Sequence, residues 1–126
     1  MDIRKMEKTV VAALEDIKGR DIVVLKVAHL SPLFERIIIA SADSTRQTKA
    51  LADNVVQKLK AAGAYVLSVE GEQTGEWVLV DLGAIVVHVM QPSIRQYYNL
   101  EELWDQPEPK RPRARRKPAD SKTAAG

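Results

Sequence analysis

The fold is decided by the stretch Trp77-Val-Leu-Val-Asp-Leu-Gly-Ala-Ile-Val-Val-His-Val-Met90, in which two β-rich runs meet at Gly83-Ala84. A two-residue connection with glycine first suits a tight turn, so residues 77–82 and 85–90 are predicted to form a β-hairpin. With Leu82 opposite Ile85, alternation gives an aliphatic face (Val78, Val80, Leu82, Ile85, Val87, Val89) and a mixed face (Trp77, Leu79, Asp81, Val86, His88, Met90). The aliphatic face has the character of a protein core.

Upstream of this hairpin the pattern predicts two helices and two buried strands. Apolar residues at helical spacing predict a helix over residues 3–17, with Gly19 as its C-cap. The β-branched runs at residues 21–27 and 36–40 are predicted to be strands that are apolar on both faces. Ser44, with Gln47 three residues later, matches a capping box and predicts a second helix that stops at Gly63.

The remaining elements complete an α/β fold. Residues 65–69 predict a third strand, which a right-handed crossover could join to residues 36–40. Pro92 can open a final short helix that carries Ile94, Tyr97 and Tyr98. The expected order is α-β-β-α-β-β-β-α, a mixed β-sheet of about five strands flanked by helices.

Composition limits the class of protein. The 126 residues are 45% apolar and 29% charged, which is ordinary for one soluble domain. No run approaches the roughly 20 apolar residues that span a bilayer, and the first residues lack a signal peptide's apolar stretch. Cysteine is absent, which excludes disulfides, thiolate catalysis and Cys-ligated zinc. The simplest expectation is a cytoplasmic protein without a membrane partner.

The net charge of +2 hides a division along the chain. Residues 108–126 contain seven basic and two acidic residues, whereas the remaining chain has 12 basic against 15 acidic residues. A mildly acidic domain is a poor general binder of nucleic acid. We therefore expect one domain over residues 1–106, followed by a disordered, basic, proline-rich tail over residues 107–126.

The residues that could carry chemistry are isolated. His29 and His88 are the two histidines, and a lone histidine on a strand is more often structural than catalytic. The candidate phosphate loop, residues 41–46, contains no glycine, so Ser44 fits a helix cap better than a ligand site. Asp81 has no second carboxylate on its strand to form a metal-binding pair. The sequence thus indicates no enzyme, cofactor or metal site.

Two interpretations of the mixed hairpin face stay open. A partly exposed set of tryptophan, methionine, histidine and carboxylate resembles the centre of a protein interface. Alternatively, helices cover this face and bury Trp77 as ordinary core. The same choice applies to Tyr97, Tyr98 and Trp104, which could simply clamp the last helix onto the sheet.

Over residues 3–105 the sequence resembles the ribosomal silencing factor family, also called Iojap. The matching sequence motifs are short, but their order and spacing are specific to the family. They are Ile39-Ala40-Ser41, Ser44-Thr45-Arg46-Gln47, Ala52-Asp53, Val69-Glu70-Gly71-Glu72, Glu76-Trp77-Val78-Leu79-Val80-Asp81-Leu82-Gly83, Ile85-Val86-Val87-His88-Val89-Met90 and Tyr98-Asn99-Leu100-Glu101-Glu102-Leu103-Trp104.

The resemblance implies a nucleotidyltransferase-like α/β fold that lacks the catalytic carboxylates of those enzymes. It implies binding to the large ribosomal subunit through the fourteenth large-subunit ribosomal protein, at the intersubunit face, which blocks joining of the small subunit when nutrients are short. It also implies a homodimer in isolation. The partner-binding residues that it maps onto this chain are Trp77, Leu79, Asp81, His88, Met90 and Tyr98.

Two departures from the family pattern stand out. Ala84 replaces the aspartate that many relatives carry after the hairpin glycine, which puts one polar contact in doubt. Ala42-Asp43-Ser44 replaces a Gly-Thr-Ser sequence before the second helix, which concerns loop geometry. Neither change removes the apolar anchors.

The mechanism expected from this resemblance is steric occlusion. Trp77, Leu79 and Met90 would dock on the ribosomal protein, and Asp81 and His88 would set the orientation. One alternative is a nucleotidyltransferase-like enzyme that uses residues 41–46 for phosphate. Another is an RNA-binding module led by the basic tail, which otherwise makes only a weak rRNA contact.

Overall fold

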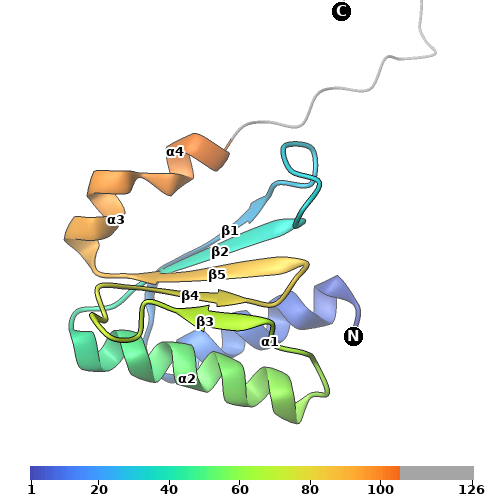
Figure 1. Ribbon diagram of the computed structural model, residues 1–126, viewed down its shortest axis with the longest axis horizontal. Helices are drawn as coiled ribbons and strands as arrows, with labels where there is room; N and C mark the ends of the chain where they lie inside the picture. Colours follow the sequence, from blue (N-terminus) through green and yellow to red (C-terminus); the bar gives the residue numbers. More distant parts are fainter. Residues whose placement is uncertain (106–126) are drawn as a thin grey trace, which may run out of the picture.

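In the computed structural model, which describes residues 1–105, five strands form one sheet and helices lie on both of its faces (Figure 1). In chain order the elements are α1 (Ile3–Asp16), β1 (Arg20–Lys26), β2 (Arg36–Ser41), α2 (Thr45–Ala61), β3 (Ser68–Glu70), β4 (Trp77–Asp81), β5 (Ile85–Met90), α3 (Pro92–Tyr98) and α4 (Leu100–Trp104). The predicted α/β class is confirmed. The order also agrees, except that the last helical region is two short helices rather than one.

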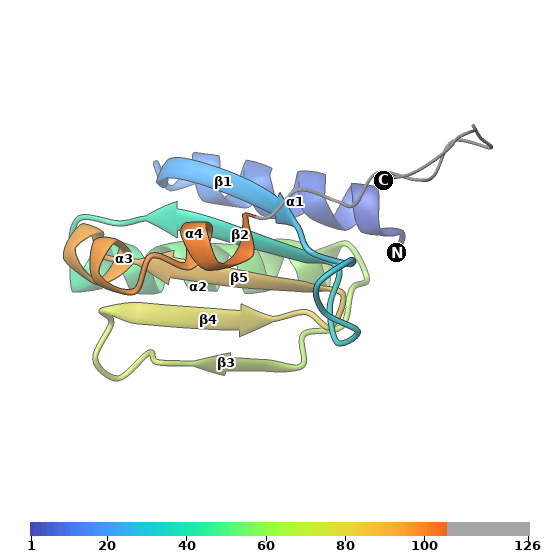
Figure 2. The same ribbon diagram turned by 90° about the horizontal axis from the view of Figure 1, so that it is seen from above.

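The sheet is mixed, with the strand order β1-β2-β5-β4-β3 (Figure 2). Only β2 and β5 pair in parallel, and the other three neighbouring pairs are antiparallel. The chain that leaves β2 through α2 reaches β3 at the far edge of the sheet, where β3 runs parallel to β2. β3 is also shorter than the strand predicted over residues 65–69, and Tyr65 and Leu67, which precede it, are 76% and 54% exposed.

Both long helices end in hydrogen-bonded caps. At the end of α1, Gly19 N–H donates to the carbonyl of Leu14 at 2.8 Å, and Lys18 N–H donates to that of Glu15 at 3.0 Å. This is a Schellman motif in which Lys18, with φ of 62°, takes the left-handed position that was predicted for glycine. Gly19 follows it, where a Cβ atom would lie 3.1 Å from the Leu14 carbonyl oxygen.

The start and end of α2 agree with the sequence. Ser44 Oγ accepts from Gln47 N–H at 3.1 Å, and Gln47 Oε1 accepts from Asp43 N–H at 2.8 Å, so both side chains cap the first turn. Gly63 follows the helix with φ of +88°, a conformation that glycine adopts without steric cost.

The sheet has a separate core on each side. The larger core lies between the sheet and α1 and α2, and its members include Val10, Leu14, Ile38, Leu51, Val55, Leu59, Val78, Val80, Val87 and Val89. The smaller core consists of Leu25, Val27, Ile37, Ile39 and Met90, with partly buried Phe34, Trp77, Ile94, Leu100 and Trp104 packed against it. Because α3 and α4 contribute Ile94, Leu100 and Trp104 over β1, β2 and β5, they leave β3 and the outer side of β4 uncovered (Figures 1 and 2).

The break between α3 and α4 occurs at Asn99, whose φ of 46° is left-handed. Asn99 ends α3 and also caps α4, because its side chain accepts from Glu102 N–H. Asparagine tolerates this conformation better than most residues, so one predicted helix becomes two. No helix among residues 1–105 is long and apolar enough to cross a membrane. The predicted tail, residues 107–126, lies outside the described residues.

Candidate protein-binding surface

The β4–β5 hairpin has the predicted register. Trp77 pairs with Met90, Leu79 with His88 and Asp81 with Val86, around a turn in which Gly83 has φ of +88°. The aliphatic side chains of the two strands lie in the larger core. The opposite side, which we call the Trp77 face, consists of Glu70, Trp77, Leu79, Asp81, Val86, His88, Met90 and the adjoining Tyr98.

Trp77 is held in a defined orientation while part of its ring stays accessible. The side chain is half-buried, and its indole N–H donates to His88 Nδ1 at 2.9 Å. Its ring centroid lies 4.9 Å from that of Tyr98 and 5.8 Å from that of His88. Aromatic pairs at these separations attract each other, so Trp77 is fixed from two sides. The structure therefore combines the two open interpretations, because one part of the ring is core and another is surface.

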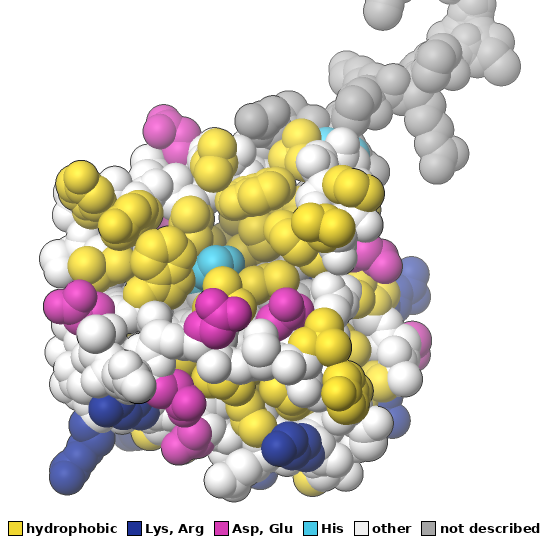
Figure 3. All heavy atoms as spheres, in the orientation of Figure 1, with side chains coloured by type: hydrophobic (Ala, Val, Ile, Leu, Met, Phe, Trp, Pro, Cys, Tyr) yellow, Lys and Arg dark blue, Asp and Glu magenta, His cyan; other side chains and the backbone are white. Residues whose placement is uncertain are grey.

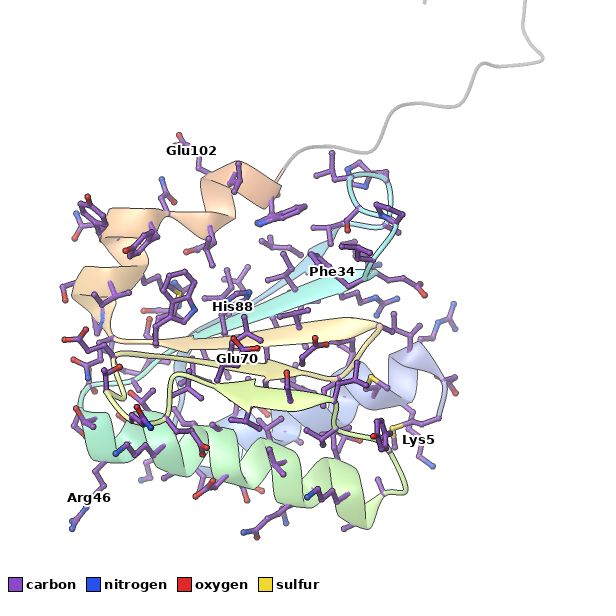
Figure 4. All side chains as sticks on the ribbon, in the orientation of Figure 1. Lys5, Phe34, Arg46, Glu70, His88 and Glu102 are labelled. Atoms are coloured by element: carbon purple, nitrogen blue, oxygen red, sulfur yellow. The ribbon has the colours of Figure 1, made fainter. Side chains whose placement is uncertain are left out.

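His88 lies next to Trp77, with ring centroids 5.8 Å apart, and is only 8% exposed, on the sheet side that faces α3 and α4 (Figure 4). Burial lowers the pKa of His88 from 6.5 to about 4, so the ring is neutral at pH 7. Since Nδ1 accepts the Trp77 bond, the neutral ring carries its proton on Nε2. His88 is therefore less exposed than a partner-contacting residue was expected to be, and its hydrogen bond through Nδ1 orients Trp77.

Met90 is fully buried, at 0% exposure, and belongs to the smaller core with Ile37 and Ile39. The expected exposure of its thioether is wrong, because the residue sits on β5 between paired strands and beneath the helical cover. Met90 supports the surface from below.

Leu79 and Asp81 lie toward the open edge of the sheet, and both are half-buried. Leu79 and Trp77 line a shallow hollow of about 230 Å³ together with Glu70 and Gly71. Asp81 Oδ1 accepts from Gly83 N–H at 2.8 Å, which leaves its second oxygen for other contacts. The hollow is the part of the Trp77 face that a partner's side chain could enter.

Tyr98 is 52% exposed, and a buried guanidinium holds its helix in place. Arg95 donates to Glu101 through Nε at 2.9 Å and through a second nitrogen at 3.1 Å, and to Ser41 Oγ at 2.8 Å. These bonds connect α3 to α4 and to the end of β2, and hydrogen bonding to Arg95 lowers the pKa of Glu101. Arg95 thereby fixes the helix that places Tyr98 beside Trp77.

Two residues that the sequence analysis did not single out, Phe34 and Leu33, extend this surface together with Trp104 and Tyr97. Phe34 and Trp104 form an edge-to-face pair with centroids 5.6 Å apart, which joins the β1–β2 loop to α4. Tyr97 is 80% exposed and Leu33 is 81% exposed. Figure 3 shows hydrophobic side chains gathered around a histidine on this side of the molecule. The adjacent Tyr97-Tyr98 pair was a signal for exposed aromatics, but nothing local indicated that the distant Phe34 meets Trp104.

The candidate phosphate loop is engaged in fold contacts. Ser44 caps α2, Ser41 accepts from Arg95, and Asp43 is paired with Arg20. Among residues 1–105, no group of three His, Asp or Glu side chains is close enough to hold a metal ion. The Trp77 face combines accessible aromatic side chains, carboxylates and a hollow, and it is the candidate site of the described chain.

Comparison with known proteins identifies the family. A family model described as "Ribosomal silencing factor during starvation" matches residues 1–126. A ribosomal silencing factor from Chromobacterium violaceum is 53% identical over 104 residues, covering 82% of this chain and 85% of that protein. A crystal structure of a protein from the same organism has a TM-score of 0.82 at 51% identity, covering 87% of this chain and 92% of that chain.

A more distant relative comes from mouse. The protein named "Mitochondrial assembly of ribosomal large subunit protein 1" is 33% identical over 97 residues, covering 75% of this chain but 42% of its own length. The full-length family match, the bacterial relative and the shared fold agree with one another. The chain belongs to the ribosomal silencing factor family.

Proposed function

We propose that this protein binds the large ribosomal subunit through the Trp77 face and thereby hinders joining of the small subunit, lowering translation when nutrients are short. The family description, with its reference to silencing during starvation, supports the regulatory role. The mouse relative's name associates that protein with the large ribosomal subunit. A ribosome-bound role in a bacterium would place the protein in the cytoplasm.

The observation that carries the proposal is the state of Trp77. A partly exposed tryptophan whose N–H is already bonded to His88 at 2.9 Å needs only an apolar surface from its partner. The ring of Tyr98, 4.9 Å away, fixes the orientation of the indole, so the Trp77 side chain loses little conformational freedom when a partner binds. Preorganised aromatic side chains next to a hollow are the usual anchors of protein interfaces.

The chemistry of the face favours a protein partner over bare RNA. From residue 61 to residue 105 the chain has seven acidic residues and one basic residue, and the basic one, Arg95, is paired with Glu101. Phosphate groups would be repelled by such a surface, whereas a basic ribosomal protein would be attracted. We propose the fourteenth large-subunit protein as that partner, with Trp77, Leu79, Asp81 and Tyr98 in contact and His88 and Met90 beneath them.

Silencing by this route needs no reaction. A domain of about 100 residues has a radius of gyration near 13 Å, so it is roughly 30 Å across. Contacts between subunits require atoms to approach within about 4 Å. A body of this size on the intersubunit side therefore prevents the small subunit from docking near it.

The test is co-sedimentation with separated ribosomal subunits, followed by a subunit-joining assay. Truncating an anchor tryptophan typically costs about 2–4 kcal/mol, so Trp77→Ala should weaken binding to the large subunit by roughly 30- to 1,000-fold. Leu79→Glu should also abolish binding, since it adds a charge to the hollow and removes little from the core. In the presence of either variant, the small subunit should join the large subunit as it does without the protein.

Controls separate binding from folding. Tyr65→Ala truncates an aromatic side chain that is 76% exposed in the segment before β3, and it should bind like wild type. A chain that ends at residue 106 should show only a modest loss. The proposal would be abandoned if Trp77→Ala and Leu79→Glu bound normally, or if their binding fell only in step with their unfolding. Loss of binding on removing the tail alone would favour an RNA-binding module.

A further inference from the structure

The charges of this chain are separated in sequence. Residues 61–105 have seven acidic residues, Glu70, Glu72, Glu76, Asp81, Glu101, Glu102 and Asp105. Residues 110–117 have six basic residues and no acidic one: Lys110, Arg111, Arg113, Arg115, Arg116 and Lys117. Within the described chain, only Glu101 of the seven acidic residues takes part in an ion pair.

The acidic residues border an apolar and aromatic surface. Glu70 lines the hollow with Trp77 and Leu79, and the loop from β3 to β4 carries Glu72 and Glu76. Figure 3 shows acidic side chains along the lower border of the hydrophobic area, whereas the Lys and Arg side chains in view lie below and to the right of it.

Arginine is the residue that suits such a surface. A guanidinium can stack on an aromatic face and donate two parallel hydrogen bonds to a carboxylate. The face offers the ring of Tyr98, which is 52% exposed, and the carboxylate of Glu70, which lines the hollow beside Trp77. Tyr97, which is 80% exposed, packs edge-on against Tyr98 with ring centroids 5.0 Å apart. An arginine-rich segment without large apolar side chains therefore fits it.

The described part of the chain ends close to this surface, five residues before Lys110. Asp105 directly follows α4, the helix that packs over the smaller core next to the Trp77 face. Residues 106–111 can span up to about 20 Å when extended, which is comparable with the width of the face of a domain roughly 30 Å across. Residues 106–117 together can span up to about 40 Å when extended, so the basic segment is long enough to extend across such a face.

We propose that residues 110–117 dock on the Trp77 face of the same molecule in the free protein, with guanidinium groups between its carboxylates and aromatic rings. A short connection gives the segment an effective concentration in the millimolar range, so contacts that are individually weak are populated. Because these charges are exposed, the contact weakens as salt rises. The segment and the proposed ribosomal partner share one surface, but the intramolecular contact does not require that partner.

The absence of cysteine from the chain makes a direct test simple. A nitroxide attached to Ala114→Cys keeps every basic side chain and broadens the NMR signals of nearby protons in the free, full-length protein. At about 20 mM salt we expect at least twofold loss of signal for the amides of Glu70, Glu72, Tyr97 and Tyr98, and for the Trp77 indole N–H. The loss should disappear at 0.5 M salt, while amides of α1 and α2 keep their intensity throughout.

A matched variant separates charge from proximity. Replacing Arg111, Arg113, Arg115 and Arg116 by Gln in the labelled chain keeps its length and attachment, and it should restore the signals. Broadening that persists in this variant, or that spreads evenly over α1 and α2, overturns the proposal. In a mixture, chains that carry the nitroxide can broaden the NMR signals of chains without it only through contact between molecules. If that broadening equals the broadening within the nitroxide-labelled protein, the occupant is a second copy and the proposal is overturned.

The result is separable from the ribosome experiment. Absence of broadening rejects the docked segment but leaves Trp77-dependent binding to the large subunit standing. Conversely, normal ribosome binding by Trp77→Ala rejects the proposed function while the broadening pattern persists. A segment that shows no contact in the free protein, but whose removal abolishes ribosome association, is an RNA-binding segment, and the docking proposal is then wrong.

Discussion

Acid should destabilise this protein through one buried histidine. His88 is 8% exposed, and burial lowers its pKa from 6.5 to about 4. A group whose pKa is lower in the folded state stabilises that state above the unfolded pKa, and the stabilisation is lost as pH falls. The relevant window therefore runs from pH 6.5 down to pH 4, where the unfolded chain binds a proton that the folded chain resists.

The magnitude follows from the difference between the two pKa values. At 1.36 kcal/mol per unit, a shift of roughly 2.5 units amounts to about 3 kcal/mol when the loss is complete. About 2 kcal/mol of this should already be lost at pH 5, where most carboxylates are still ionised. For a domain of this size, such a loss lowers Tm by roughly 10 °C.

The matched variant is His88→Asn, which places a carbonyl oxygen near the position of Nδ1 and cannot titrate. Urea unfolding of both proteins at pH 7, 6, 5 and 4 separates His88 from groups that the two chains share, such as the Arg95-bonded Glu101. Between pH 7 and pH 5 the wild type should lose about 2 kcal/mol more than the variant. Parallel losses in the two proteins would refute the reasoning, whatever their stabilities at pH 7.

Two further pairs of substitutions test how the surface is supported. Arg95→Met leaves Glu101 and a buried hydroxyl unpaired, so it should lower the free energy of unfolding by about 2 kcal/mol. Glu101→Gln keeps hydrogen-bonding capacity at a partly exposed site and should cost less than about 1 kcal/mol. Urea unfolding measures both losses. Gly71→Ala should lower the stability by more than about 2 kcal/mol, because φ is +89° and the added Cβ would collide with the Trp77 carbonyl oxygen. Gly63→Ala is its control, since φ is +88° but nothing lies within 4 Å of the added atom, and it should cost only about 1 kcal/mol. Equal losses for the two glycine variants in thermal unfolding would contradict the steric argument.

Local patterns were sufficient for the elements and for the hairpin. The period-two alternation of residues 77–90, with glycine first in the turn, determined the pairing of Trp77 with Met90. The spacing of Ser44 and Gln47 was enough to place the start of α2. In each case the interacting groups are close in sequence, so a short segment contains all the residues that determine the local structure.

The misjudged features depend on distant parts of the chain. Alternation assigned His88 and Met90 to a face, but their exposure of 8% and 0% depends on paired strands and on helices that pack from elsewhere in the sequence. The position of β3 at the far edge depends on how α2 crosses the sheet, which no local pattern encodes. The split at Asn99 accompanies the bonds from Arg95 to Glu101 and Ser41, and Ser41 lies 54 residues away.

The burial of His88 changes how Trp77 should work as an anchor. A partner that covers Trp77 also removes water from the indole N–H, and an unpaired buried donor costs about 1–3 kcal/mol. The acceptor at His88 Nδ1 already satisfies that donor within the protein, so the partner need supply no polar group there. His88→Leu should therefore weaken binding to the large subunit by roughly 5- to 150-fold relative to His88→Asn. The two variants should be compared at matched fractions of folded protein, by co-sedimentation at pH 7.5, where neither side chain is charged. Equal binding would mean that the indole N–H finds its acceptor on the partner, and Trp77 would then be a polar contact as well as an apolar one.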